Sequence, residues 1–532
     1  MKKWIPILIL AIAQFVMVLD GTVMNVSIST VAKDLGTTIT GMQSAITVFT
    51  LTMAAFMLTG GKLGDIWGRH RALRIGAVIY GLGSLITALA PTLGILFFGW
   101  SIVEGLGAVL VIPAIASLAA SNYGGKNRVI AFSLLGAATG LAAALGPLIG
   151  GFMTTYFSWR YVFAAETVIM IIVLFFSGKV RDAKVARKAK LDVPSVVLSA
   201  GGMGIFVFGV LQSRSWGWVR PLGSPTINGT EITPFGISLV AYLIVVGAVV
   251  LKLFYDRQVK LSAKGKQPLL KVSMFKLPIL RSGLTMLMAQ YFTIASVFFI
   301  IPVYLQTILG YNALETGIKL MPLSIGMLLF TLYGSKKAAV ISTRRIVRFG
   351  QIAMATGAVF ILASIAPELG SISFWMGMFI IGSGFGLLAS QLGNVNMSAV
   401  GESESSEVGG LQGVFQNLGL SLGTALIGSI FVLSLTSGFT TAIQSSADLS
   451  PQAKSAISAE AESGVGIVSE SQAEAYVISN GGSKGTAESV ANTYTNSQLD
   501  SLRVSMFFVF GLLILSLFFS TKLPTSVENK KA

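Results

Sequence analysis

Long apolar runs separated by short polar connections repeat along this 532-residue chain. Most runs reach the ~20 residues that a helix needs to cross ~30 Å of hydrocarbon. They predict fourteen transmembrane helices, at residues 5–28, 41–61, 73–91, 94–118, 129–153, 160–178, 193–213, 235–255, 280–305, 314–334, 347–366, 372–397, 408–436 and 504–521. The pattern therefore predicts an all-α integral membrane protein.

Composition agrees with this pattern and excludes a soluble protein. Hydrophobic residues make up 53% of the chain and charged residues only 11%, whereas soluble proteins carry about 25% charged residues. The first apolar run is too long for a secretory signal and contains Asp20, so we expect an uncleaved helix. The chain has no cysteine, which excludes disulfides and thiolate metal sites.

The net charge of +16 is spread over short connections rather than gathered on one binding face, so nucleic acid is not an expected partner. Basic residues fall in alternate connections: Lys2/Lys3, Arg69–Arg74, Lys126/Arg128, 179–190, 252–281, 336–348 and Lys530/Lys531. By the positive-inside rule these connections are cytoplasmic. We therefore expect a multi-pass protein of the cell membrane with both termini in the cytoplasm.

The largest connection on the other side, residues 437–500, is rich in Ser, Ala and Glu. Its composition is compatible with helix but lacks a strong apolar period, so it is either a solvated extracellular loop or a mobile cap. The weak period favours the loop.

A short repeat suggests how the helices are grouped. Phe132-x-x-Leu135-Gly136-x-x-x-Gly140 recurs 283 residues later as Phe415-x-x-Leu418-Gly419-x-x-x-Gly423. This offset pairs the first six helices with the last six. We therefore expect an N-terminal six-helix bundle (1–178), two inserted helices (179–278) and a C-terminal six-helix bundle (279–532), an organisation found in one large transporter class.

The connection between the second and third predicted helices contains a dense motif of glycines and charges. Its residues are Gly61, Gly64, Asp65, Gly68, Arg69 and Arg71. Glycine lets helix ends approach closely, and a carboxylate there can pair with arginine or accept hydrogen bonds from helix ends. The motif resembles the signature loop of the major facilitator superfamily. That resemblance implies a major facilitator fold in which these residues act as a gate.

Two further motifs resemble drug exporters within that superfamily. The fifth predicted helix contains Gly136, Gly140, Gly146, Pro147, Gly150 and Gly151. Such small residues allow close helix packing and Pro147 bends the axis, and the Gly-Pro-x-x-Gly-Gly ending resembles the antiporter motif. Leu19-Asp20-Gly21-Thr22 through Asn25 resembles the first helix of the fourteen-span drug:proton antiporter family. The resemblance implies multidrug efflux driven by protons.

Three acids lie inside predicted helices: Asp20, Glu104 and Glu166. An ionisable residue within a membrane helix costs about 2.5 kcal/mol or more, so it suggests a functional role. We expect one acid to hold a proton and a cationic substrate in alternation. The alternative is that each acid only hydrogen-bonds to a neighbouring helix. The sequence also departs from the family pattern, because Ser101 stands where an arginine is common.

Polar and aromatic residues in the helices of the two bundles are candidates for the substrate site. They are Asn25, Gln290, Tyr291, Phe292, Phe298, Asn394, Asn396, Gln412 and Gln416. Aromatic faces together with acids suit amphipathic cations. The alternative for the aromatic residues is simple packing against lipid or neighbouring helices.

The predicted function is therefore secondary active export, with proton-coupled antiport of amphipathic, often cationic, drugs by alternating access. Export or flipping of an endogenous lipid, siderophore or metabolite is the alternative. No catalytic motif, metal-ligand cluster or nucleotide-binding loop is recognisable, so we expect neither an enzyme nor a resident cofactor or metal. The expected partners are a small-molecule substrate, protons and the bilayer, and the expected state is a monomer.

Overall fold

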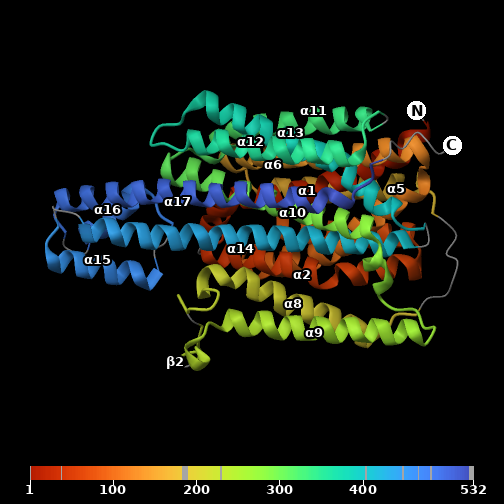
Figure 1. Cartoon of the computed structure of the whole chain (residues 1–532), viewed down its shortest axis with the longest axis horizontal. Coiled ribbons are helices and arrows are strands. Elements are labelled where there is room, and N and C mark those ends of the chain that lie inside the picture. The colour runs from red at the N-terminus through yellow and green to blue at the C-terminus, as the bar shows by residue number, and fades with distance from the viewer. Residues whose placement is uncertain are drawn as a thin grey trace.

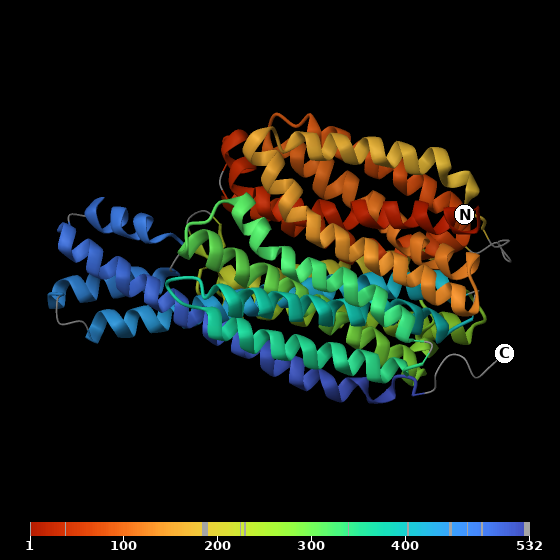
Figure 2. The same cartoon turned by 90° about the horizontal axis from the view of Figure 1, so that it is seen from above.

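A computed structural model describes residues 2–37, 39–182, 190–223, 225–227, 230–338, 340–401, 404–445, 449–464, 467–479 and 482–525. Its long helices run roughly parallel to one axis (Figure 1). Both chain termini lie at the same end of the bundle in both views (Figures 1 and 2). We call this end the terminal face and the opposite end the distal face.

The N-terminal half and the insert contain ten of the longer elements. They are α1 (Ile5–Asp34), α2 (Ile39–Trp67), α3 (Arg69–Ala88), α4 (Leu93–Leu96), the π-helix η2 (Phe97–Glu104), α5 (Gly105–Asn122), α6 (Gly125–Tyr156), α7 (Arg160–Phe176), α8 (Val193–Trp216) and α9 (Leu239–Ala263). Strands β1 (Thr226–Ile227) and β2 (Thr230–Glu231) pair between α8 and α9.

The C-terminal half contains nine more. They are α10 (Pro278–Pro302), the π-helix η6 (Val303–Ile308), α11 (Ala313–Lys337), α12 (Thr343–Ser364), α13 (Ser371–Ser398), α14 (Ser405–Ser445), α15 (Pro451–Gly464), α16 (Glu470–Ser479) and α17 (Lys484–Phe519). Short 3₁₀ turns are η1 (Lys2–Trp4), η3 (Ser177–Lys179), η4 (Pro234–Gly236), η5 (Val272–Lys276) and η8 (Ser520–Lys522).

Thirteen helical segments of the described chain are long and apolar enough to cross a membrane. They correspond to thirteen of the fourteen predicted helices. The remaining one is α3, whose first two turns contain Arg69, Arg71 and Arg74 and lower its apolar character. Even so, α3 is 20 residues long and packs against α5 and α7. The all-helical fold agrees with the prediction. Arginines near the start of a helix lower its mean hydropathy, so a helix such as α3 is less apparent from apolar length alone.

The two halves use matching helix pairs. In the N-terminal half α1 packs on α6 and α3 packs on α5, while in the C-terminal half α10 packs on α14 and α12 packs on α13. Contacts between the halves match too, because α6 packs on α11 and α14 packs on α2. The two copies of the repeat motif lie on α6 and α14.

The distal segment corrects one prediction. We expected a solvated loop at residues 437–500. Instead, α14 continues to Ser445, α15 and α16 follow, and α17 begins at Lys484. These helices project beyond the bundle at the distal face (Figure 2). The apolar period is weak because α15 and α16 each pack on a single long helix, α14 and α17 respectively, so only a narrow stripe needs to be apolar.

The inserted pair α8 and α9 lies along one side of the bundle (Figure 1). Helix α8 contacts both α2 and α14, so it touches both halves. Asp192 caps α8 through the backbone amide of Ser195 and also binds Arg257 of α9. The two inserted helices are therefore joined at the terminal face.

Candidate functional site

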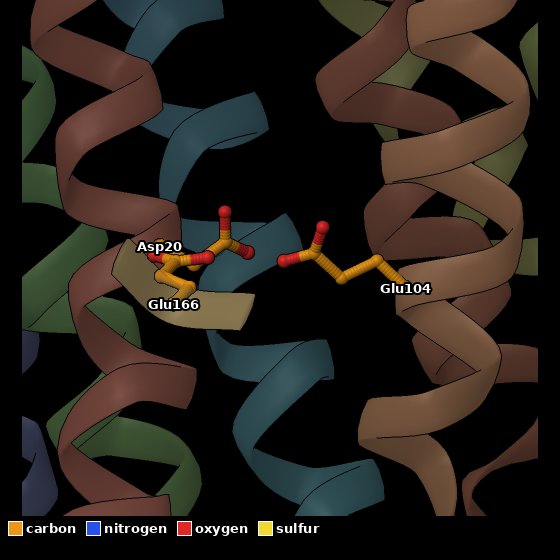
Figure 3. Close-up of side chains that lie close together, drawn as sticks. All are labelled: Asp20, Glu104 and Glu166. Carbon is orange, nitrogen blue, oxygen red and sulfur yellow. The ribbon is translucent and has the colours of Figure 1, made fainter. Parts of the chain in front are cut away.

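Three acids from distant parts of the sequence meet inside the N-terminal half. Asp20 comes from the middle of α1, Glu104 from the end of η2, and Glu166 from α7. All three are fully buried, and one carboxylate oxygen of each lies within 4.8 Å of those of the other two. Figure 3 shows the three side chains pointing toward one another. We call this group the carboxylate cluster.

Only some of the carboxylate oxygens in the cluster accept hydrogen bonds. The indole Nε1 of Trp100 donates to Oδ1 of Asp20 at 2.7 Å. Oε2 of Glu166 accepts from the hydroxyls of Tyr80 at 3.4 Å and Ser84 at 3.3 Å. Among the described residues, Oδ2 of Asp20, Oε1 of Glu166 and both oxygens of Glu104 have no hydrogen-bond partner.

Close packing of α3 against η2 and α5 positions Glu104. A Cβ at Gly83 would lie 2.5 Å from the backbone nitrogen of Glu104, and one at Gly107 would lie 2.4 Å from that of Tyr80. Only glycine permits this approach. Ser101, which replaces the arginine common in the family, donates to the carbonyl of Ala45 on α2 at 2.8 Å. The serine therefore fixes η2 to α2 without adding a positive charge.

A separate cavity of about 100 Å³ lies between the two halves. Gln290, Tyr291, Gln412 and Gln416 line it from α10 and α14, and Gln14 lines it from α1. Its described lining contains none of the three acids. Gln14 precedes Asp20 by six residues on α1, which corresponds to about 9 Å along a helix axis. The structure thus separates the predicted acids from the predicted cavity residues.

The other predicted binding residues lie elsewhere. Phe292 is buried on α10 where Gly419 and Gly423 of α14 pack, and Phe298 packs against the apolar core of the C-terminal half. Asn394 and Asn396 are buried on α13 outside the cavity lining. The side chain of Asn25 lies outside the described part of the structure.

The predicted gate residues lie where α2 and α3 meet the start of α14 at the terminal face. Arg69 donates through Nε to Oγ of Ser406 at 2.9 Å, and Asp65 lies beside the same serine. A Cβ at Gly61 would lie 2.8 Å from the carbonyl oxygen of Ser406. Gly68 connects the two helices with a φ of 93°, which favours glycine. In this conformation the two halves are in contact at the terminal face.

Two residues of the predicted motif contribute less to this contact. A Cβ at Gly64 would lie 4.0 Å from the Cβ of Ala72 on α3, on the same side of the junction. Arg71 is exposed to solvent. Their positions do not bring them to the other half.

Sequence reasoning missed the ion pairs that strengthen the gate. Nζ of Lys62 lies 3.3 Å from Oε1 of Glu407, and both side chains are buried. The backbone amide of Lys271 donates to Oε2 of Glu407 at 3.1 Å, and its Nζ binds Glu404 at 2.8 Å. This hydrogen bond to Glu404 raises the pKa of Lys271. One signal was available in the sequence, since Glu407 directly precedes a predicted helix. An acidic side chain is stabilised near the N-terminus of a helix.

The glycines of the predicted antiporter motif pack on two different partners. A Cβ at Gly146 or Gly150 would meet Thr22 or Val23 of α1, so this end of α6 lies against the helix that contains Asp20. At Gly136 and Gly140 it would meet α13 and α11 of the other half. Pro147 lies within α6, and Gly151 is buried beside it. Helix α6 therefore packs on α1 of its own half and on α11 and α13 of the other half.

A family model described as the Major Facilitator Superfamily matches residues 10–424. The chain belongs to the major facilitator superfamily. It is a membrane transporter rather than an enzyme, as this family and the transporter names of its relatives indicate.

Several curated members of the superfamily are similar over most of their length. The "Probable actinorhodin transporter" of Streptomyces coelicolor is 25% identical over 84% of this chain and 75% of its own. The "Methyl viologen resistance protein SmvA" of Salmonella typhimurium is 25% identical over 85% and 86%. The "Multidrug resistance protein Stp" of Mycobacterium tuberculosis is 22% identical over 79% and 74%.

Solved major facilitator structures share the fold. The human organic anion transporter MFSD10 superimposes with a TM-score of 0.55 at 10% identity, covering 98% of this chain and 99% of its own. The proton:xylose symporter XylE gives a TM-score of 0.53 at 12% identity, covering 94% of each chain. At these identities the likeness concerns the fold alone.

Proposed function

We propose that this protein is a proton-coupled exporter of amphipathic, often cationic, drugs. Relatives named for resistance to methyl viologen, for multidrug resistance and for actinorhodin transport support export. The observation that supports proton coupling most directly is the buried carboxylate cluster. Membrane-embedded acids are costly and commonly act in proton relays.

The separation of the cluster from the cavity refines how coupling works. We expected one acid to hold a proton and the substrate in alternation. In the proposed mechanism the cluster exchanges protons, and substrate binds about two helical turns away at Gln290, Tyr291, Gln412 and Gln416. Helix α1 contributes Gln14 to the cavity and Asp20 to the cluster, so a shift of α1 links the two events.

Alternating access completes the mechanism. Drug-sized sites occupy about 300–1,000 Å³, so the cavity of about 100 Å³ must enlarge before substrate binds. The gate at Lys62, Arg69, Ser406 and Glu407 opens as the halves rotate apart. The terminal face, where basic connections gather, is proposed to be cytoplasmic. The transporter acts as a monomer, with units 1–178, 179–278 and 279–532.

The proposed energetics are adequate for drug export. A proton that crosses ~150 mV releases about 3.5 kcal/mol. That free energy sustains roughly a 300-fold gradient of a neutral solute.

Purified protein in lipid vesicles with an imposed pH gradient tests the proposal. We expect a fluorescent amphipathic cation to accumulate against its gradient only while the pH gradient persists. Asp20→Asn should abolish this accumulation while the protein still inserts in the membrane. Uptake that ignores the pH gradient would contradict proton coupling and favour export or flipping of an endogenous lipid, siderophore or metabolite.

A further inference from the structure

The geometry of the carboxylate cluster also fits a metal ion. One oxygen each from Asp20, Glu104 and Glu166 lies within 4.8 Å of the other two. Oxygen ligands on opposite sides of Ca²⁺ are about 4.6–5.2 Å apart, since each Ca–O distance is about 2.3–2.6 Å. The three oxygens can therefore share one ion of this size after small side-chain shifts. No metal-ligand motif is visible in the sequence, because these acids are 62 to 146 residues apart along the chain.

The second observation is the burial of the Glu104 carboxylate. Glu104 is fully buried, neither of its carboxylate oxygens has a hydrogen-bond partner among the described residues, and its carboxylate points toward Asp20 and Glu166 (Figure 3). A buried ionised carboxylate beside two other acids and without a positive partner is strongly unfavourable. Its charge must therefore be neutralised, either by a proton or by a bound cation.

Among the described residues, no cationic side chain forms an ion pair with the cluster. The ion pairs found there lie at the gate, near helix ends, in the inserted pair or within α17. The neighbouring polar groups, Trp100, Tyr80 and Ser84, are neutral donors. Protons or a bound cation must provide the positive charge.

We propose that Asp20, Glu104 and Glu166 form a binding site for one hard divalent cation of the Ca²⁺ or Mn²⁺ class. A set of oxygen ligands without His or Cys selects hard cations. Mg²⁺ fits less well, because it retains several waters and demands strict octahedral geometry, whereas this site is fully buried. The inference rests on the same residues as the proposed function, but binding can be measured without transport.

The neighbouring donors would complete the site. A divalent ion leaves one negative charge on three ionised carboxylates. Trp100 already holds Oδ1 of Asp20, which leaves Oδ2 for the ion. Tyr80 and Ser84 similarly hold Oε2 of Glu166 and leave Oε1. These three residues would orient the ligands and stabilise the remaining charge.

Mn²⁺ binding to the purified, detergent-solubilised full chain tests the proposal. Electron paramagnetic resonance counts free Mn²⁺, since the bound ion loses its sharp six-line signal. We expect one tightly bound Mn²⁺ per chain, displaced by excess Ca²⁺. Glu104→Gln and Glu166→Gln, which keep side-chain size, should each weaken binding at least about 10-fold. Glu488→Gln, at an exposed acid on α17, is the matched control and should bind like wild type.

A second measurement locates the ion and guards against misfolded variants. Tb³⁺ replaces Ca²⁺ and emits when a nearby indole is excited, so bound Tb³⁺ should be sensitised by Trp100. Trp100→Phe should bind the ion more weakly, because the indole no longer orients Asp20, and it should lose this emission even at a Tb³⁺ concentration that saturates the site. Equal binding by wild type and well-folded Glu104→Gln would overturn the proposal, as would no tight Mn²⁺ binding by wild type. Proton-driven export with no Mn²⁺ binding would refute the metal site alone, whereas Mn²⁺ binding without proton-driven export would refute only the proposed function.

Discussion

The N-terminal and C-terminal halves of the chain share their helix pairing but differ in what they bury between their helices. The N-terminal bundle encloses three carboxylates where α1, η2 and α7 meet. In the C-terminal half α12, the counterpart of α3, meets α10 and α17 around neutral groups, and Nε2 of Gln351 donates to Oγ of Ser516 at 2.7 Å. At these places the N-terminal half holds carboxylates, whereas the C-terminal half holds an amide and a hydroxyl.

This difference indicates that two halves with the same helix packing can carry different functional groups. Packing is conserved between the halves because small residues fix helix distances, whereas the polar residues inside each half are free to differ. In our account the N-terminal half exchanges cations and the C-terminal half supplies most polar contacts to substrate. The gate connects the two, because Lys62 comes from one half and Glu407 from the other.

The largest expected effect comes from breaking that connection. Lys62→Ala leaves Glu407 buried without its partner, and breaking a buried ion pair costs about 3–5 kcal/mol. The contact at the terminal face should open. Because the chain has no cysteine, a single Val408→Cys, buried in wild type, reports opening through its rate of thiol labelling, which should rise strongly.

The matched control removes both charges. Lys62→Ala with Glu407→Ala should label more slowly than Lys62→Ala alone, because no unpaired charge remains. Labelling that is equally fast in both would show that the ion pair does not hold the halves together.

The next effect concerns packing that the N-terminal bundle needs to position Glu104. Gly83→Ala forces a Cβ within 2.5 Å of the Glu104 backbone, and such overpacking costs about 1–3 kcal/mol. Thermal unfolding in detergent should show a clearly lower midpoint. Gly511→Ala on α17, where nothing lies within 4 Å of the added Cβ, should leave the midpoint unchanged or raise it. A Gly83→Ala protein as stable as wild type would refute this packing role.

A smaller effect is expected at the neutral counterpart in the C-terminal bundle. Gln351→Leu removes the hydrogen bond to Ser516 and should cost about 1 kcal/mol of stability. Proton-driven uptake into vesicles should continue at a rate close to that of wild type, in contrast to Asp20→Asn. Loss of the pH-gradient dependence in Gln351→Leu would mean that coupling is not confined to the N-terminal half.

The smallest effect lies outside both bundles, at the joined ends of α8 and α9. The Arg257 guanidinium holds the pKa of Asp192 well below its ordinary value. This stabilisation is therefore present at neutral pH and is lost only as strong acid protonates Asp192. Asp192→Asn keeps a helix cap but removes the ion pair, so at pH 7 it should cost about 0.2–1 kcal/mol. Thermal unfolding at pH 7 should detect it, and Asp192→Ala should cost more.

Much of the fold could be predicted from the sequence because apolar runs and glycine motifs are local signals. The apolar runs predicted the helices, and the repeat at Gly136 and Gly419 predicted the pairing of the halves. The three acids were recognised singly, since each is unusual within a membrane helix. Their meeting was not predictable, because it depends on the approach of α3 to η2 at Gly83 and on helix orientation.

The distal helices and the gate ion pairs show a different limit of prediction from the sequence. The helices α15 and α16 have an apolar stripe that is too narrow to give a clear period. Lys62 and Glu407 are 345 residues apart, and nothing local to either one indicates its partner. Contacts between the halves therefore needed the three-dimensional structure.

Proton release upon substrate binding tests the central claim most directly. Purified protein in weakly buffered detergent solution with a pH indicator is mixed with a saturating amphipathic cation. We predict that wild type releases protons and that Asp20→Asn, Glu104→Gln and Glu166→Gln release fewer or none while still binding the cation at the separate cavity. Undiminished release from all three variants would contradict the assignment of proton exchange to the carboxylate cluster.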